Sequence, residues 1–291
     1  MRILVTGSAG MLGRAVTSAL AGAHTVAGVD LPDGDLTVPA DVDRLLALHR
    51  PEWVVHTAAY TDVDRAETDR DRAWAVNADA TALLAERCAR AGCGLTYIST
   101  DYVFDGEDPA GYAEDAPRRP LGWYGRSKAA GEEAVEKLAT PWQIVRTSWL
   151  FGPGPRNFVL TIRRLLRERE RLRVVDDQRG RPTYAPDLAA VLARLVDARA
   201  TGVFHATNAG DCTWFAFARE IARREGYDPA RIAPCASDEY PTPARRPRCS
   251  ILHSRRLEAV GVPPRPPWQD ALGRYLEWLR WQERARPEEE R

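Results

Sequence analysis

The stretch RILVTGSAGMLG, residues 2–13, decides the expected fold of this 291-residue chain. Its first residues are apolar and partly β-branched, which is typical of a buried strand. Gly7, Gly10 and Gly13 follow directly and open a helical pattern. Glycines in such a turn allow a tight bend, a close approach of backbone to a pyrophosphate, and close packing of helix on strand. The stretch therefore predicts a dinucleotide site, with G-x-x-G-x-x-G spacing in place of the more familiar G-x-G-x-x-G.

Strand-like and helix-like segments alternate through the first half of the chain. Short strand-like runs bounded by turn residues lie at 2–6, 25–29, 53–58, 95–100 and 142–148. Helical patterns lie between them at 11–21, 40–49, 69–91 and 125–138. This alternation implies right-handed βαβ crossovers. We therefore predict an α/β fold with a doubly wound parallel sheet, which binds ligands at the carboxyl ends of its strands.

The alternation loosens after residue 150, which predicts a smaller second lobe. We expect a Rossmann dinucleotide-binding domain at 1–150, a return to it at about 172–200, and mainly a C-terminal substrate-binding lobe across 151–291. Prolines crowd residues 229–267, which favours loops and short elements over the site. An amphipathic pattern predicts a terminal helix, after which residues 286–291 should fray.

Composition argues against several classes of protein. The 41 basic and 41 acidic residues cancel, so no global charge attracts nucleic acid or an anionic membrane. The five cysteines are too scattered for a metal ribbon and too few for a disulfide scaffold, which is typical of reduced cytosolic thiols. We see no signal-peptide pattern and no run of ~18 apolar residues. We therefore expect a cytoplasmic protein that binds neither membrane nor nucleic acid.

The second strand carries the next cofactor signal. Asp30 lies at its tip, where a carboxylate accepts hydrogen bonds from an adenosine ribose, although it could equally be a turn residue. No arginine or lysine follows closely to receive a 2'-phosphate, which favours NADH mildly over NADPH. We assign this end of the cofactor to Gly7, Gly10, Met11, Leu12, Gly13, Asp30, Asp35 and Leu36.

The third strand ends in small residues. Ala58 and Ala59 leave room for a flat cofactor where a core position would carry a bulkier side chain. Thr61 and Val63 would then line the approach to the nicotinamide. We therefore place the nicotinamide end of the cofactor beside this strand. We also assign Tyr124 and Lys128 to the cofactor, because Lys128 can hydrogen-bond the nicotinamide ribose.

The fourth strand and the next helix carry the chemistry. Ser99 and Thr100 present hydroxyls at the strand's end, where they could also cap a turn. Tyr124 and Lys128 stand four residues apart on one helix face, which is also a common surface pair. A phenol has a pKa near ~10, so a nearby cation helps it give up a proton at neutral pH. With Thr100 holding a ketone oxygen and Tyr124 donating the proton, these groups are suited to carbonyl reduction.

These features resemble the extended short-chain dehydrogenase/reductase superfamily. Five phrases are similar, in order and over nearly the whole chain, to the dTDP-4-dehydrorhamnose reductase family: STDYVFDG, YGRSKAAGE, RTSWLFGPGPRNF, DDQRGRPT and YPTPARRP. The resemblance implies NADPH- or NADH-dependent reduction of the C4 ketone of a dTDP-linked 4-keto-6-deoxyhexose, the last step to dTDP-L-rhamnose.

The resemblance also implies a substrate site. Related dehydratases carry Thr-Asp-Glu where this chain has Thr100, Asp101 and Tyr102, so elimination lacks its base and reduction is favoured. Trp149 matches a position that packs on the sugar, although it could be a core residue. Arginines suit a diphosphate, although runs of them usually form solvated faces, and Arg245 is included on this ground. We assign the substrate to Val63, Thr100, Asp101, Tyr102, Tyr124, Trp149, Asn157, Arg181 and Arg246.

One departure from the family concerns metal. Some members form magnesium-bridged dimers through glutamates at places that fall on Ala15 and Pro186, which cannot ligate a metal through their side chains. We therefore expect no metal site, and a monomer or weak dimer. Three alternatives stay open: a reductase for another dTDP-4-keto sugar such as a dihydrostreptose synthase, a non-catalytic NADP-binding regulatory subunit, and an epimerase.

Overall fold

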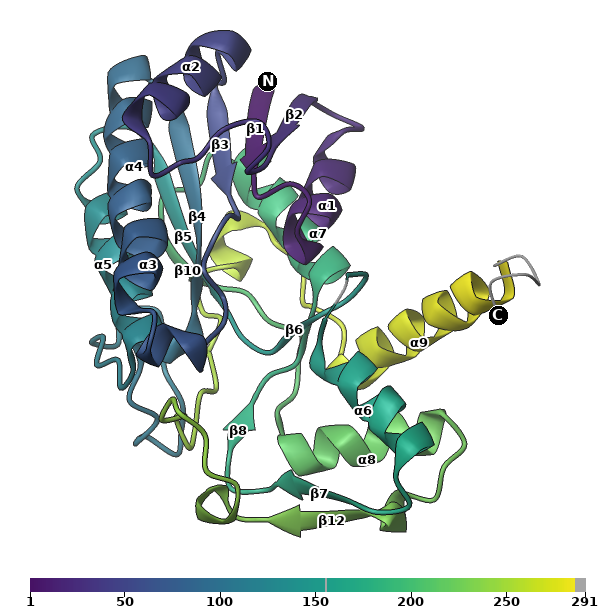
Figure 1. Cartoon of the computed structure of the whole chain (residues 1–291). Helices are drawn as coiled ribbons and strands as arrows, with labels where there is room; N and C mark the ends of the chain where they lie inside the picture. The colour runs from purple at the N-terminus through teal and green to yellow at the C-terminus, as the bar shows by residue number, and fades with distance from the viewer. Residues whose placement is uncertain (155, 286–291) are drawn as a thin grey trace.

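A six-stranded sheet forms the centre of the larger lobe (Figure 1). The structure is a computed structural model that describes residues 1–154 and 156–285. The strands are all parallel, in the order β10-β5-β4-β3-β1-β2. Their bounds are β1 (Arg2–Thr6), β2 (Thr25–Val29), β3 (Trp53–His56), β4 (Gly94–Thr100), β5 (Trp142–Thr147) and β10 (Gly202–His205). The predicted doubly wound α/β fold is thus confirmed, with the predicted strand positions kept to within two residues.

Helices cover both faces of this sheet, as the alternation of the sequence predicts. One face carries α1 (Met11–Leu20) and α7 (Ala185–Asp197), which pack on each other. The other face carries α2 (Pro39–His49), α3 (Arg70–Trp74), α4 (Ala80–Ala91) and α5 (Trp123–Glu136), as Figure 1 shows. Each face has its own apolar core, built around β1 residues such as Val5 on the α1 side and Leu4 on the α4 side. The alternation of side chains along one strand supplies both cores.

The predicted helix at 69–91 is interrupted. Between α3 and α4 the chain makes a π-helical turn, Ala75–Asp79, in which Asn77 is buried. Such turns are rare and often occur near functional sites. Here the turn aims the Asn77 amide toward α5, as described below.

The smaller lobe is made of short elements around an aromatic core. Its helices are α6 (Phe158–Glu168), α8 (Trp214–Arg224) and the terminal α9 (Trp268–Ala285). Its strands pair two by two: β6 (Leu150–Phe151) with β9 (Thr183–Tyr184), β7 (Leu172–Val175) with β12 (Ile232–Cys235), and β8 (Arg179–Gly180) with β11 (Cys212–Thr213). Phe151, Phe217 and Tyr275 are fully buried at its centre. Isolated one-turn helices lie at Arg65–Glu67, Asp101–Val103, Pro229–Arg231, Ser237–Glu239 and Glu258–Val260.

The chain crosses between the lobes more than once. Residues 172–184 contribute to the small paired strands, whereas α7 and β10 belong to the larger lobe. The proline-rich segment 229–267 forms short elements as predicted, but it also supplies β12. The division into domains stays a prediction. The tail at 286–291, predicted to fray, lies outside the described residues.

Candidate active site

The glycine turn has the geometry that the sequence predicts. Gly7 has φ +69°, and a Cβ on it would lie 2.6 Å from the backbone nitrogen of Ala58. A Cβ on Gly13 would lie 2.7 Å from the Cα of Ser8, so only glycine lets α1 pack this closely on the turn. Gly10 occupies the N-cap of α1 and brings no side chain to its first amides. The start of the helix is therefore open to an anionic group.

A cavity of about 980 Å³ extends from this turn across the carboxyl ends of the strands. Every residue that the sequence assigns to the cofactor lines it: Gly7, Gly10, Met11, Leu12, Gly13, Asp30, Asp35, Leu36, Ala58, Ala59, Thr61, Tyr124 and Lys128. Of the substrate residues, Val63, Thr100, Asp101, Tyr102, Tyr124 and Trp149 line it too. The fold thus brings both sets together in one cavity, and their roles stay predictions.

Asp30 is both a turn residue and a cavity residue. Its carboxylate accepts hydrogen bonds from the backbone amides of Ala9 and Leu31, each at 2.9 Å. The bond to Ala9 joins the tip of β2 to the glycine turn. A carboxylate is therefore held at the end of the cavity where the sequence predicts an adenosine ribose.

Tyr124 and Thr100 meet at the other end. Burial raises the pKa of Tyr124 to about 12, against a hydrogen bond with Thr100 that lowers it, while the Asp101 charge raises it further. The Tyr102 ring packs edge-on against the Tyr124 ring, with centroids 5.6 Å apart. Tyr124 is therefore a neutral phenol near neutral pH, and it holds a proton that it can donate.

Lys128 is a buried amine next to these groups. It is 2% exposed, and its Nζ lies 4.0 Å from the centroid of the Tyr97 ring. Burial lowers the pKa of Lys128 to about 7, against the opposing charge of Glu132. Lys128 is therefore a group that titrates near neutrality, whereas the sequence alone suggests a permanent cation.

Asp101 is a second buried titratable group at this end. Its carboxylate accepts a hydrogen bond from the Thr100 hydroxyl at 3.0 Å. Burial raises the pKa of Asp101 to about 6, although the hydroxyls of Ser250 and Thr100 oppose the rise. A carboxyl with this pKa exists in both forms near neutral pH.

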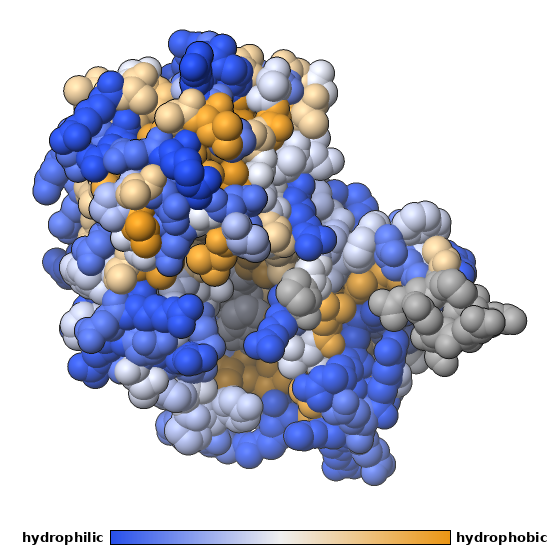
Figure 2. Space-filling view, turned by 45° about the horizontal axis from the view of Figure 1, so that its top comes forward, coloured by the Kyte–Doolittle hydropathy of each residue, from blue (hydrophilic) through white to orange (hydrophobic). Residues whose placement is uncertain are grey.

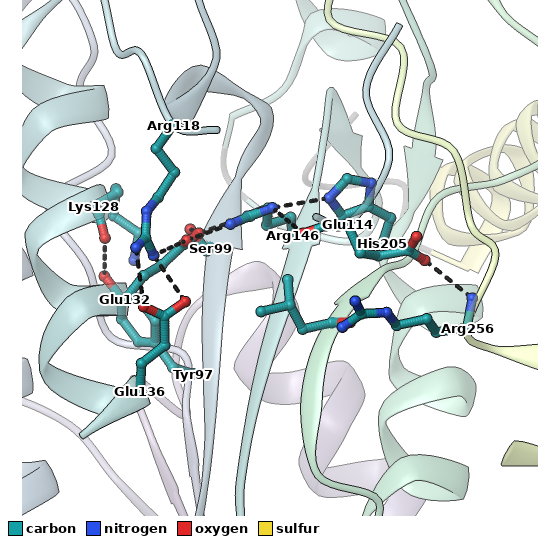
Figure 3. A network of polar contacts seen from close by, with 11 residues as sticks. Tyr97, Ser99, Glu114, Arg118, Lys128, Glu132, Glu136, Arg146, His205 and Arg256 are labelled. Atoms are coloured by element: carbon teal, nitrogen blue, oxygen red, sulfur yellow. Dashed lines mark hydrogen bonds and ion pairs between the residues drawn. The ribbon is translucent and has the colours of Figure 1, made fainter. Parts of the chain in front are cut away.

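A buried network of ionic and polar contacts lies next to Lys128 (Figure 3). Glu132, one turn after Lys128 on α5, accepts from the Ser99 hydroxyl at 2.5 Å and from the Arg146 guanidinium at 2.9 and 2.7 Å. Arg118 donates to the same carboxylate at 3.0 Å. Burial alone would raise the pKa of Glu132, but these donors hold it below its usual value. The network fixes α5 to the ends of β4 and β5.

Three supporting residues of the site are not among those predicted from the sequence: Glu132, Arg146 and Asn77. Asn77 donates to the Ser127 hydroxyl at 3.0 Å and to the Tyr60 carbonyl at 3.0 Å, which ties the π-helical turn to α5. The four-residue spacing from Lys128 to Glu132 could have revealed Glu132, because it puts both on one helix face. Arg146 and Asn77 give no such local signal.

A larger cavity of about 1590 Å³ lies beside the smaller lobe. It is lined by parts of α6 and β7, by Trp214, and by the arginines of the 240–248 segment, Arg245 and Arg246 among them. Figure 2 shows the molecule hollowed between its lobes, with apolar side chains inside the hollow. This cavity has room for a second, bulkier part of a substrate.

Two contacts join the cavities. Trp149 lines the smaller cavity and stacks on Trp214, which lines the larger one. Arg246 lines the larger cavity, pairs with Asp64 at 2.8 Å, and is close enough for its charge to oppose the rise in pKa that burial causes at Tyr102, which lines the smaller one. A ligand that extends from one cavity to the other would thus pass these residues.

Asn157 and Arg181 line neither of these cavities. The Asn157 side chain caps α6 by accepting from the Leu160 amide at 3.0 Å, and it donates to the Tyr275 hydroxyl at 3.0 Å. Burial lowers the pKa of Arg181, whose Nε is buried without a hydrogen-bond partner among the described residues, while burial and the Arg181 charge lower the pKa of Arg265. The substrate roles of Asn157 and Arg181 stay predictions.

No group of three or more histidine, cysteine, aspartate or glutamate side chains suited to a metal ion occurs within residues 1–154 and 156–285. Within the same residues, no helix has the length and apolarity that crossing a membrane requires.

Comparisons with known proteins agree with this arrangement. The model of the RmlD substrate binding domain matches residues 1–280. A dTDP-4-dehydrorhamnose reductase of Streptomyces griseus is 44% identical over 93% of this chain and 91% of its own. A dTDP-4-keto-6-deoxy-D-glucose reductase of Streptomyces niveus is 41% identical over 93% and 95%. The crystal structure of dTDP-4-dehydrorhamnose reductase from Bacillus anthracis in complex with NADP is 38% identical, with a TM-score of 0.91 over 94% of this chain and 98% of that one.

Proposed function

The chain belongs to the RmlD substrate binding domain family, and from this premise we propose that it is an NAD(P)H-dependent reductase of dTDP-4-keto-6-deoxy-L-hexoses. The substrate we propose is dTDP-4-dehydro-L-rhamnose, whose C4 ketone becomes the alcohol of dTDP-L-rhamnose. The observation that carries the proposal is that Thr100, Tyr124 and Lys128 line one cavity together with the glycine turn. A proton donor therefore lies at one end of a cavity whose other end suits a pyrophosphate.

The residues at the glycine turn fit a dinucleotide. A Cβ on Gly7 or Gly13 would clash with backbone atoms, so the turn is narrow and lined by backbone. The Asp30 carboxylate offers hydrogen-bond acceptors to a ribose, and the small side chain of Ala58 leaves room in the cavity. We propose that these residues hold NADH or NADPH, a cofactor that supplies the hydride for the ketone carbon.

The remaining chemistry belongs to side chains of this chain. Tyr124 carries its proton because its pKa is raised, and it donates that proton to the ketone oxygen as the carbon is reduced. Thr100 holds the same oxygen by hydrogen bonding. Lys128, in its charged form, offsets the negative charge left on Tyr124. One hydride and one proton thus convert the ketone to an alcohol.

We propose that the sugar lies in the smaller cavity, against Trp149 and Tyr102, and the thymidine in the larger one. Arg245 and Arg246 are then the side chains offered to the diphosphate between them, since guanidinium groups suit phosphate oxygens. Asn157 and Arg181 stay outside this proposal because neither lines either of these two cavities.

Steady-state kinetics test the diphosphate assignment. Arg246→Ala should raise the KM for the dTDP-sugar. Asp64→Asn is the matched control, because it breaks the same ion pair and keeps the guanidinium. If both variants raise KM equally, the effect comes from the broken pair, and Arg246 is removed from the site.

The function itself is tested with the purified protein. We would supply dTDP-4-keto-6-deoxy-L-lyxo-hexose, made in situ by a 3,5-epimerase, and follow the absorbance of NADH or NADPH. A fall in absorbance with formation of dTDP-L-rhamnose supports the proposal. Product formation without net cofactor oxidation would point to an epimerase, and binding without turnover to a non-catalytic subunit.

The Streptomyces niveus relative supports a second candidate. Its name refers to dTDP-4-keto-6-deoxy-D-glucose, and its identity to this chain is 41%, close to the 44% of the Streptomyces griseus reductase. The second candidate substrate is therefore another dTDP-4-keto hexose. Comparing kcat/KM across a panel of such sugars decides between them.

We also propose that the protein is cytoplasmic, binds neither membrane nor nucleic acid, and is a monomer or weak dimer without a magnesium bridge. Ala15 lies on α1 and Pro186 on α7, two helices that pack together, and neither side chain can ligate a metal. Light scattering with and without a chelator tests this, and a dimer lost on chelation would overturn it.

A further inference from the structure

Asp101 is a buried carboxyl at the reacting end of the smaller cavity, and the mechanism above gives it no task. It follows Thr100 at the end of β4 and begins the one-turn helix Asp101–Val103. It is 2% exposed and lines the same cavity as Tyr124. A buried carboxyl beside the reacting groups calls for an explanation, because burial without a cationic partner is costly.

The proton of the Thr100 hydroxyl is engaged when Asp101 is ionised. It is donated to Asp101 Oδ1 at 3.0 Å, and the hydroxyl oxygen accepts from the Tyr102 amide at 3.2 Å. Tyr124 also lies near this hydroxyl. A hydroxyl has one proton and two lone pairs. In this state Thr100 has no proton left for a ketone oxygen.

A proton on Asp101 changes that arrangement. A neutral carboxyl can donate through its own O–H, so the 3.0 Å contact persists with its direction reversed. Thr100 can then turn its proton to the ketone oxygen. One lone pair of Thr100 then accepts from Asp101, while the other stays with the Tyr102 amide. Every donor and acceptor at Thr100 is again matched.

The surroundings of Asp101 favour such a switch. Its Oδ2 makes no hydrogen bond of good geometry to any described residue, so the ionised form is poorly stabilised. The titratable groups whose charge interacts with it are the phenols of Tyr102 and Tyr124, whose pKa values burial raises. Burial likewise raises the pKa of Asp101 to about 6, despite the Ser250 and Thr100 hydroxyls. Of Asp101, Tyr102 and Tyr124, Asp101 is thus the one that changes charge near neutrality, as Lys128 of the same cavity also does.

We propose that Asp101 is a positioning residue for ketone reduction: by sharing a proton with Thr100, it decides whether the Thr100 hydroxyl points at the carboxyl or at the ketone oxygen. The inference rests on the proposed function. The proton that enters the product comes from Tyr124, and Asp101 keeps its own proton through the turnover. Asp101 therefore acts through Thr100 and need not touch the substrate.

A ratio of pH profiles tests the proposal. We would measure kcat against pH for the wild type and Asp101→Asn, and divide the second by the first, so that the titration of Lys128 cancels. The side-chain amide that this substitution introduces donates to Thr100 at every pH, so the ratio should rise about tenfold as Asp101 ionises in the wild type and then level off. In a Thr100→Val background the same ratio should stay flat within about twofold, because the effect passes through the hydroxyl. A flat ratio in both backgrounds, or the same rise in both, would overturn the proposal.

A second measurement does not depend on turnover. The Asp101 carboxyl can be followed by ¹³C NMR against pH, with its signal assigned by its loss in Asp101→Asn. Thr100→Val removes a donor to the anion, so the midpoint of the Asp101 titration should rise. A midpoint that does not move overturns the proton sharing by itself. If the wild type oxidises no cofactor with any dTDP-4-keto sugar, the proposed function fails, and this titration still decides the Thr100–Asp101 contact.

Discussion

The indole rings of Trp149 and Trp214 lie nearly parallel, with centroids 3.5 Å apart and planes 9° apart. Trp149 adopts φ +47°, an uncommon value for a bulky residue, and its ring lies against Gly180. A strained backbone persists only where its surroundings hold it. The stack thus fixes the wall between the smaller cavity and the larger cavity.

A methyl group under this wall should disturb the sugar and spare the cofactor. A Cβ on Gly180 would lie 2.6 Å from the Trp149 Nε1, so Gly180→Ala must displace the indole. We expect the KM for the dTDP-sugar to rise about tenfold, which corresponds to ~1.4 kcal/mol, with the KM for NADH unchanged. Gly22→Ala is the control, because nothing lies within 4 Å of a Cβ there. Equal effects on both KM values would contradict a wall that contacts only the sugar.

Removing the Tyr124 hydroxyl should abolish proton transfer. Tyr124→Phe keeps the buried ring and its contact with Tyr102, so the fold should persist while kcat falls ~10²-fold or more. Tyr227→Phe, in the smaller lobe, is a matched control that should keep full activity. Turnover near the wild-type level in Tyr124→Phe would remove Tyr124 as the acid.

Lys128 should make the reaction pH-dependent near neutrality. Its pKa is lowered to about 7, so the fraction of charged Lys128 falls as pH rises through that value. The kcat should fall with it, because the charged form offsets the tyrosinate. We would measure this in the Asp101→Asn variant, where Asp101 no longer titrates. Lys128→Arg, which stays charged, should lose this dependence, and an unchanged decline in that variant would assign it to another group.

Asp30 should set the preference between the two cofactors. Its carboxylate is fixed 2.9 Å from the Ala9 amide, where it would repel a 2'-phosphate. Asp30→Ser should therefore raise the NADPH-to-NADH ratio of kcat/KM by about tenfold, or ~1.4 kcal/mol. Asp43→Ser, which removes an exposed carboxylate on α2, should leave the ratio unchanged. No change in the Asp30 variant would mean that the cofactor is recognised elsewhere.

His56 should make the fold sensitive to acid. Burial, with the Lys128 charge, lowers the pKa of His56 to about 3, whereas an unfolded histidine titrates near ~6.5. The folded pKa is the lower one, so the unfolded chain binds the extra proton, and stability is lost as pH falls from ~6.5 toward the folded pKa. We expect the free energy of unfolding to drop by up to ~1.4 kcal/mol per pH unit from this group. Urea titrations at several pH values give the free energy of unfolding of the wild type and of His56→Asn. If this free energy falls equally steeply with falling pH in both proteins, His56 is not the cause of the acid sensitivity.

Short sequence patterns predicted those parts of the site whose residues lie close together in the chain. The glycine turn, the strand ends and the Tyr124–Lys128 pair each depend on neighbours within a few residues. The stack on Trp214 lies 65 positions from Trp149 in the chain, and no periodicity reports such a contact. Asn157 directly precedes an apolar helical run and caps α6, as that position indicates, while its substrate role stays a prediction.

The place of β10 in the sheet has a consequence for synthesis on the ribosome. β10 pairs with β5, and Gln143 of β5 donates to the carbonyls of Leu195 and Ala200, so the larger lobe is closed by residues made after much of the smaller lobe. A nascent chain that ends near residue 150 has an unpaired edge at β5 and a bare face on α1. Such edges invite association with other chains. Release of the first half before β10 emerges should therefore yield aggregates instead of a free nucleotide-binding module.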